Sequence, residues 1–123
     1  MKLTDHFTLQ EFASWDGAAI PISVQSQLMK VAANLEVLRS EIGLPIVINS
    51  GYRSPAHNEA IGGARYSYHL RGMAADIRIP GLTPSEVFSE IRRLIAAGEM
   101  TPGGLKKYDT FVHYDIRGIL VLF

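Results

Sequence analysis

The stretch that decides the fold is Ser67-Tyr-His69-Leu-Arg-Gly72-Met-Ala74-Ala-Asp76, which runs directly into Ile77-Arg78-Ile79. Its imidazole and its carboxylate lie seven residues apart, and the Gly and Ala residues between them let the backbone turn sharply and pack closely. The residues from Met73 to Ile79 are typical of a strand. A sharp turn followed by a strand would allow the side chains of His69 and Asp76 to converge on one point.

Periodicity and capping residues in the rest of the chain predict an α+β fold. Thr8 and Thr83 each begin a capping box, and Ser23 is predicted to cap a long helix with a single apolar stripe. We expect N-terminal helices packed on a small, mainly antiparallel sheet, with residues 1–123 forming one domain. Helices are expected at about residues 9–14, 23–42, 55–62 and 84–97, strands at about 46–48 and 73–79, a loop at 101–104, and a closing pair of strands at 110–116 and 118–122.

The composition excludes several classes of protein. The 123 residues are 47% hydrophobic and 20% charged, which suits a folded domain rather than a disordered chain. Lys and Arg total 12, as do Asp and Glu, so no broad basic face for nucleic acid is expected. The absence of cysteine rules out disulfides, thiolate zinc fingers, iron–sulfur clusters and cysteine nucleophiles. With neither an apolar run of membrane-spanning length nor a signal segment, the protein is expected to be made in the cytoplasm and to stay there unless released.

A second imidazole comes from the predicted strand Phe111-Val-His113-Tyr-Asp115. Two histidines and one carboxylate suit an open zinc site, in which three protein ligands leave the fourth position to water. A closed structural site would usually take a cysteine as the fourth ligand, and the chain has none. The spacing alone is also compatible with a zinc-free α+β domain whose histidines meet no metal.

Together these motifs resemble the signature of the zinc D-Ala-D-Ala metallopeptidases. That family includes D-alanyl-D-alanine carboxypeptidases, vancomycin-resistance dipeptidases and phage peptidoglycan endopeptidases, and it shares a fold with the Hedgehog signalling domain. The resemblance rests on Ser67-x-His69-x-x-Gly72-x-Ala74-x-Asp76 and the later Phe111-Val-His113-x-Asp115. Further matches are Ser50-Gly-Tyr-Arg53-Ser-Pro55, Asn58, Gly62-Gly63 and His6-Phe-Thr-Leu-x-Glu-Phe12, the last being similar to the small phage and bacterial branch.

The resemblance implies roles for individual residues. It implies His69, Asp76 and His113 as zinc ligands, and it implies that Arg53 lies in the substrate cleft and pairs with a carboxylate of the stem peptide. As an alternative, Arg53 is a surface residue of a turn. Ser67 would hold either the loop or the substrate. His57 is a further candidate for substrate contact, although a surface position on a short helix suits it better.

The position of the general base stays open. Many relatives carry Glu or Asp three residues before the second histidine, where this chain has Thr110. If residues 109–115 are extended, Asp109 and Asp115 both share the face of His113, about 13 Å and about 7 Å away along the strand. Asp115 is favoured slightly as the base, and it could instead orient a histidine ligand. A bulge or turn near Thr110 would bring Asp109 inward.

The function implied by the resemblance is zinc-dependent hydrolysis of peptide bonds at D-amino acids in peptidoglycan stem peptides. The protein would be a monomeric carboxypeptidase or endopeptidase, with a phage endolysin among the candidates, and would act on the cell wall after release or as a phage component. The alternative is a catalytically silent, zinc-containing binding or phage assembly module of the same fold, which the altered position at Thr110 favours.

Overall fold

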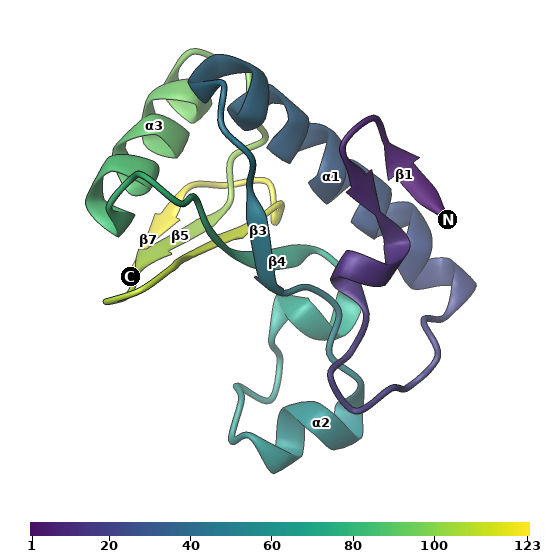
Figure 1. Ribbon diagram of the computed structural model, residues 1–123. Helices are drawn as coiled ribbons and strands as arrows, with labels where there is room; N and C mark the ends of the chain where they lie inside the picture. Colours follow the sequence, from purple (N-terminus) through teal and green to yellow (C-terminus); the bar gives the residue numbers. More distant parts are fainter.

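A five-stranded sheet forms the centre of the molecule (Figure 1). The computed structural model describes residues 1–123 and has three α-helices, two 3-10 helices and two sheets, which confirms the predicted α+β class. In chain order the elements are β1 (Lys2–Thr4), β2 (Phe7–Thr8), the 3-10 helix η1 (Leu9–Phe12), α1 (Ile22–Ile42), β3 (Val47–Ser50), α2 (Pro55–Ala60), the 3-10 helix η2 (Tyr68–Arg71), β4 (Ala74–Arg78), α3 (Pro84–Ala96), β5 (Gly104–Lys107), β6 (Val112–Asp115) and β7 (Val121–Leu122).

The strand order of the large sheet is β3-β4-β6-β5-β7. All neighbouring strands are antiparallel except β5 and β7, so the prediction of a mainly antiparallel sheet is confirmed. The expected direct pairing of the last two strands is wrong, because β5 lies between β6 and β7. None of the helices is long and apolar enough to cross a membrane.

Strand β5 escapes prediction because its residues give a weak local signal. The segment Gly-Leu-Lys-Lys has no β-branched residue, and two glycines precede its leucine. The structure shows why glycine is needed there. A Cβ atom on Gly103 would overlap the carbonyl oxygen of Asp115, and one on Gly104 would meet the carboxylate of Asp115 and the guanidinium of Arg117.

The two faces of the sheet have different roles. Ile77 of β4 and Tyr114 of β6 face the hydrophobic core, where α1 and α3 pack. Side chains alternate along a strand, so Asp76 and His113 face the opposite side. In Figure 1, α1 and α3 meet at the top of the view, and α2 lies apart from them at the bottom. The polar face of the sheet therefore borders the segment that carries α2 and η2.

The helix starts predicted at Thr8 and Thr83 are confirmed. Thr8 and Thr83 both form capping boxes, and Pro84 is the first residue of α3 as its fixed backbone angle favours. The prediction for Ser23 is wrong, because α1 begins one residue earlier at Ile22 and no side chain caps it. The apolar stripe of this helix fixes its position in the core without help from a cap.

We expect Thr83→Ala to lower the free energy of unfolding by about 1 kcal/mol. The Thr83 hydroxyl accepts a hydrogen bond from the backbone N–H of Glu86 at 3.2 Å, and the alanine variant leaves that donor without its partner. Urea unfolding followed by circular dichroism measures the change. Ser89→Ala, an exposed change in the same helix, is the control and should cause no loss. Equal midpoints for Thr83→Ala and the unchanged protein would contradict the capping role.

Candidate metal centre

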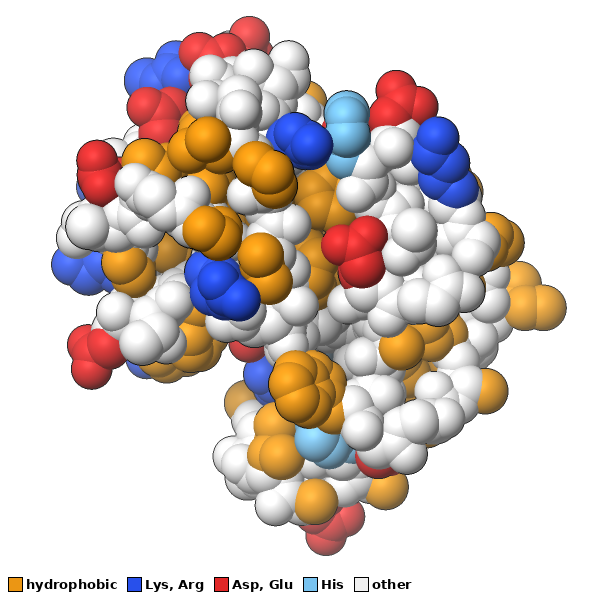
Figure 2. All heavy atoms as spheres, in the orientation of Figure 1, with side chains coloured by type: hydrophobic (Ala, Val, Ile, Leu, Met, Phe, Trp, Pro, Cys, Tyr) orange, Lys and Arg blue, Asp and Glu red, His pale blue; other side chains and the backbone are white.

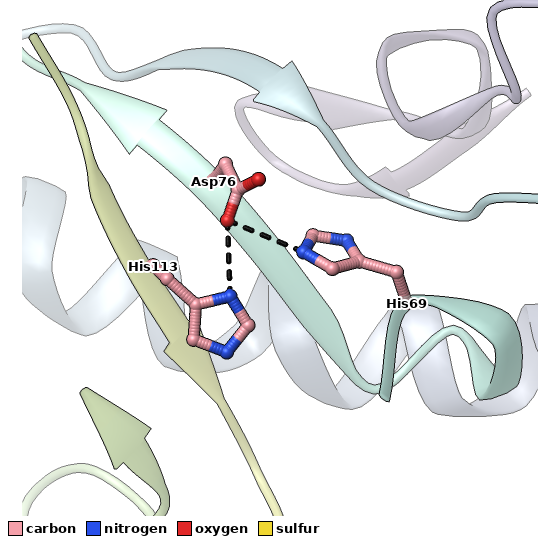
Figure 3. Close-up of side chains that lie close together, drawn as sticks. All are labelled: His69, Asp76 and His113. Atoms are coloured by element: carbon pink, nitrogen blue, oxygen red, sulfur yellow. Dashed lines mark hydrogen bonds and ion pairs between the residues drawn. The ribbon is translucent and has the colours of Figure 1, made fainter. Parts of the chain in front are cut away.

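Three side chains from separate elements meet on the polar face of the sheet (Figure 3). Asp76 of β4 and His113 of β6 are direct cross-strand partners, and η2 supplies His69. One ligand atom from each residue lies within 4.8 Å of the others, and all three side chains are largely buried. The structure thus brings together the three residues that the resemblance implies as zinc ligands.

The turn that precedes β4 explains how His69 and Asp76 converge. The Ser67 hydroxyl accepts a hydrogen bond from the backbone N–H of His69 at 3.2 Å and so caps η2. Gly72 then ends η2 in the left-handed region, with φ of 68°, and lies against Val24 so closely that a side chain would clash. The predicted sharp turn is therefore present, and Ser67 serves in it as a helix cap.

The hydrogen bonds of His69 decide which of its nitrogens faces the site. Nδ1 lies 2.7 Å from the carbonyl oxygen of Gly51, which can only accept, so Nδ1 carries the proton in a neutral ring. The lone pair of Nε2 then points at Oδ1 of Asp76, 3.2 Å away. A lone pair and a carboxylate oxygen cannot bond to one another unless a cation lies between them. The donor atoms are thus arranged as metal ligands are.

His113 has a carboxylate at each of its two nitrogens. Nδ1 lies 3.0 Å from Oδ1 of Asp76, and Nε2 lies 2.8 Å from Oδ2 of Asp115. A neutral ring can donate to only one of them. Burial works against the charged form of the ring, but the hydrogen bonds with Asp115 and Asp76 outweigh it and raise the pKa of His113. In the protonated ring the Nδ1–H points to the position where a divalent cation would be held.

The Asp76 carboxylate is ionised. Burial alone would raise its pKa, but hydrogen bonds with His113 and His69 outweigh burial and hold the pKa of Asp76 well below its usual range. Oδ2 also accepts a hydrogen bond from Arg53 at 3.2 Å. Arg53 is held in turn by Asn58 and Ser50, each at 3.4 Å, and its side chain is only 15% exposed. Arg53 thus lies beside the candidate ligands and is not a free surface residue.

Asp115 is fully buried, and both of its oxygens already accept hydrogen bonds. Oδ1 accepts from the backbone N–H of Gly104 at 2.8 Å and from Arg117 Nε at 2.9 Å. Oδ2 accepts from an Arg117 terminal nitrogen at 2.7 Å and faces His113 Nε2. Burial would raise the pKa of Asp115, but the bonds with Arg117 and His113 outweigh it and lower the pKa. The carboxylate faces a histidine nitrogen on the side away from Asp76.

Asp109 lies away from this group. The backbone N–H of Tyr108 donates to the carbonyl of Phe111 at 2.9 Å, so Asp109 and Thr110 form the two-residue turn between β5 and β6. Asp109 is exposed and makes no ion pair or side-chain hydrogen bond. Strand β6 begins only at Val112, so the extended segment that was expected to place Asp109 on the face of His113 is not present.

A pocket of about 490 Å³ opens in front of the candidate ligands. Arg53, Ser67 and Arg117 line it together with the three ligand residues, and aromatic side chains form much of the remaining wall. In Figure 2 an indentation on the left separates the lower lobe, which contains α2, from the strands. His57, which is partly buried on α2, is not part of the lining.

Two residues of the site were missed at the level of sequence. Arg117 pairs with Asp115, and its guanidinium lies 4.5 Å from the centre of the Tyr68 ring. Its spacing of two residues from Asp115, on the same face of an extended segment, is the signal that could have indicated it. The Gly51 carbonyl that orients His69 left no such signal, because a backbone oxygen has no residue-specific pattern.

Comparison with known proteins identifies one family. The sequence model of the family described as Peptidase M15 matches residues 5–115, which is nearly the whole chain and spans all three candidate ligands. No curated protein matches the chain.

Proposed function

The chain belongs to the Peptidase M15 family, and from this premise we propose that it hydrolyses peptide bonds at D-amino acids in peptidoglycan stem peptides. The family is one of zinc-dependent metallopeptidases. The observation that carries the proposal is the convergence of the His69 lone pair, the His113 ring and the ionised Asp76 on one point. This donor set of two imidazoles and one carboxylate suits a catalytic zinc, which keeps an open coordination position.

We assign the metal to His69 Nε2, His113 Nδ1 and Asp76 Oδ1. Bound there, zinc would supply a water of lowered pKa and would polarise the scissile carbonyl. The remaining work falls to the chain itself. The Gly51 carbonyl and the Asp115 carboxylate each accept the outer N–H of one histidine, which fixes the ring and directs its lone pair inward. Arg53 lines the pocket beside Asp76 and offers N–H groups to a substrate carboxylate or carbonyl.

We assign to Asp115 the role of orienting the His113 ring, and not that of a general base for the attacking water. Its two oxygens already accept hydrogen bonds from Gly104, Arg117 and His113, so neither is free to take a proton from a water in the pocket. Asp109 has a free carboxylate but lies at the tip of the β5–β6 hairpin. A base role for Asp109 requires that the tip bend toward the pocket when substrate is bound.

One observation favours a second candidate function, a zinc-containing binding module without catalytic activity. Asp76 is the only carboxylate that lines the pocket, and its oxygens already contact the two histidines and Arg53. Thr110, at the position where many relatives carry an acidic residue, cannot accept a proton at neutral pH. A module of this kind would bind stem peptides through the same pocket without cleaving them.

Digestion of a defined muropeptide tests the first function against the second. The zinc-loaded protein should release a product whose mass identifies the bond cut, and a chelator should stop the release. Binding of the muropeptide without any change in its mass would support the binding module and overturn the hydrolase.

We expect zinc affinity to fall as the pH falls through the raised pKa of His113. Above that pKa the ring is neutral and zinc has no proton to displace. Below it zinc must displace one proton from the ring, so the apparent zinc affinity falls by about tenfold for each pH unit. Because the pKa is raised, the loss begins above pH 6.5, the usual value for histidine. Competition with a chromophoric chelator between about pH 5 and pH 8 measures the change. An affinity that stays constant over this range would contradict the assignment of His113.

A further inference from the structure

Lys106 lies directly beside the candidate metal centre. It is the cross-strand partner of His113 in the β5–β6 pair, so both side chains are on the polar face of the sheet. The neighbouring Lys107 points to the other face, where its ammonium donates to Ser85 of α3 at 3.0 Å. The two adjacent lysines therefore face opposite sides, and only Lys106 shares the side of the pocket.

The ammonium of Lys106 is held by aromatic rings and has no carboxylate partner. Its Nζ lies 4.9 Å from the centre of the Tyr108 ring and 5.9 Å from that of Phe123, and both rings line the pocket. The Phe123 ring in turn lies 5.8 Å from the ring of His113. Lys106 takes part in no ion pair and no side-chain hydrogen bond. The rings thus hold a positive charge in place while leaving its N–H groups free.

The two cations that line the pocket already have carboxylate partners. Arg53 donates to Asp76, and Arg117 donates to Asp115 through two nitrogens. Lys106 lies just outside the lining, next to the Tyr108 and Phe123 rings, so a substrate carboxylate at this edge of the pocket would find its unpaired partner there. Since the ammonium sits one strand away from His113, the carboxylate that it binds must lie close to the scissile bond.

We propose that Lys106 is a specificity-determining residue that selects peptides carrying a free carboxylate next to the bond presented to the metal. The inference rests on the proposed function and extends it. Stem peptides offer two sources of this carboxylate, the C-terminal carboxylate and the free carboxylate of a D-glutamate within the stem. The chemistry that Lys106 recognises is the same in both.

Calorimetric titration with three synthetic stem pentapeptides tests the inference. One has both carboxylates free, one has its C-terminus as an amide, and one has its D-glutamate carboxylate as an amide. We expect the zinc-loaded protein to bind one of the two amides about tenfold more weakly than the free peptide, and that amide identifies the source. Lys106→Gln should remove the preference, and Lys106→Arg should keep most of it. Lys107→Gln is the matched control and should leave the preference unchanged.

Two kinds of result would overturn the role of Lys106. The first is that the unchanged protein binds all three peptides equally or binds none of them. The second is that the preference survives in Lys106→Gln, or that Lys107→Gln loses it to the same extent. Product masses from the same mixtures report separately on hydrolysis. A preference that depends on Lys106 without any cleavage supports the inference and overturns the hydrolase, whereas cleavage without a preference does the reverse.

Discussion

His69→Ala should reduce bound zinc from about one ion per chain to less than a tenth of that. The variant removes one of three protein ligands and the only one that comes from η2. It also removes the ring that the Gly51 carbonyl holds in place, so no other nitrogen can take the position of Nε2. Any zinc-dependent release of product should disappear with the metal. Elemental analysis after dialysis at matched protein concentration measures the loss.

A matched histidine variant separates this effect from a general loss of histidine. His57→Ala removes a ring that lies on α2 outside the pocket lining, and it should keep its zinc. His69→Ala should also remain folded, because alanine has a high helix propensity and suits the short helix η2. Circular dichroism can verify that the variant is folded. Zinc bound at one equivalent in a folded His69→Ala protein would refute the ligand assignment.

Local sequence patterns predicted those parts of the fold that depend on neighbouring residues. The capping boxes at Thr8 and Thr83 involve groups only three residues apart, and both are present. Strand β5 depends instead on the close approach of Gly103 and Gly104 to Asp115, which is 11 residues from Gly104. Since a glycine in sequence does not say what backbone approaches it, the pairing partner of β6 could not be predicted.

The candidate site shows the same division. The motif from Ser67 to Asp76 named residues that do converge, because a turn and a strand within one short segment leave little freedom. The role of Asp115 could not be predicted, since it depends on what surrounds each oxygen. Arg117 and the backbone N–H of Gly104 donate hydrogen bonds to this carboxylate. Only the folded β5–β6–β7 region brings these groups together.

Asp115→Asn should weaken zinc binding by about 10- to 100-fold. The asparagine keeps the shape of the side chain but removes the negative charge that faces Nε2 of His113 and the guanidinium of Arg117. With a weaker acceptor at Nε2, the ring is held less firmly and its Nδ1 becomes a poorer donor to the metal. Titration of the metal-free variant with zinc, against a competing chelator, measures this affinity without any turnover.

The same measurement separates two roles for Asp115. A residue that only takes a proton from the attacking water would leave zinc affinity unchanged and lower kcat, whereas a residue that holds His113 must change the affinity itself. Asp109→Asn removes the other candidate carboxylate, which touches neither histidine, and should leave zinc affinity unchanged. Asp115→Asn also leaves the guanidinium of Arg117 without its carboxylate partner, which can destabilise the fold. The double variant with Arg117→Gln removes that unpaired charge and serves as the stability control. A double variant that is as stable as the unchanged protein and binds zinc equally well would show that Asp115 does not position His113. The role left for Asp115 would then be proton transfer with the attacking water.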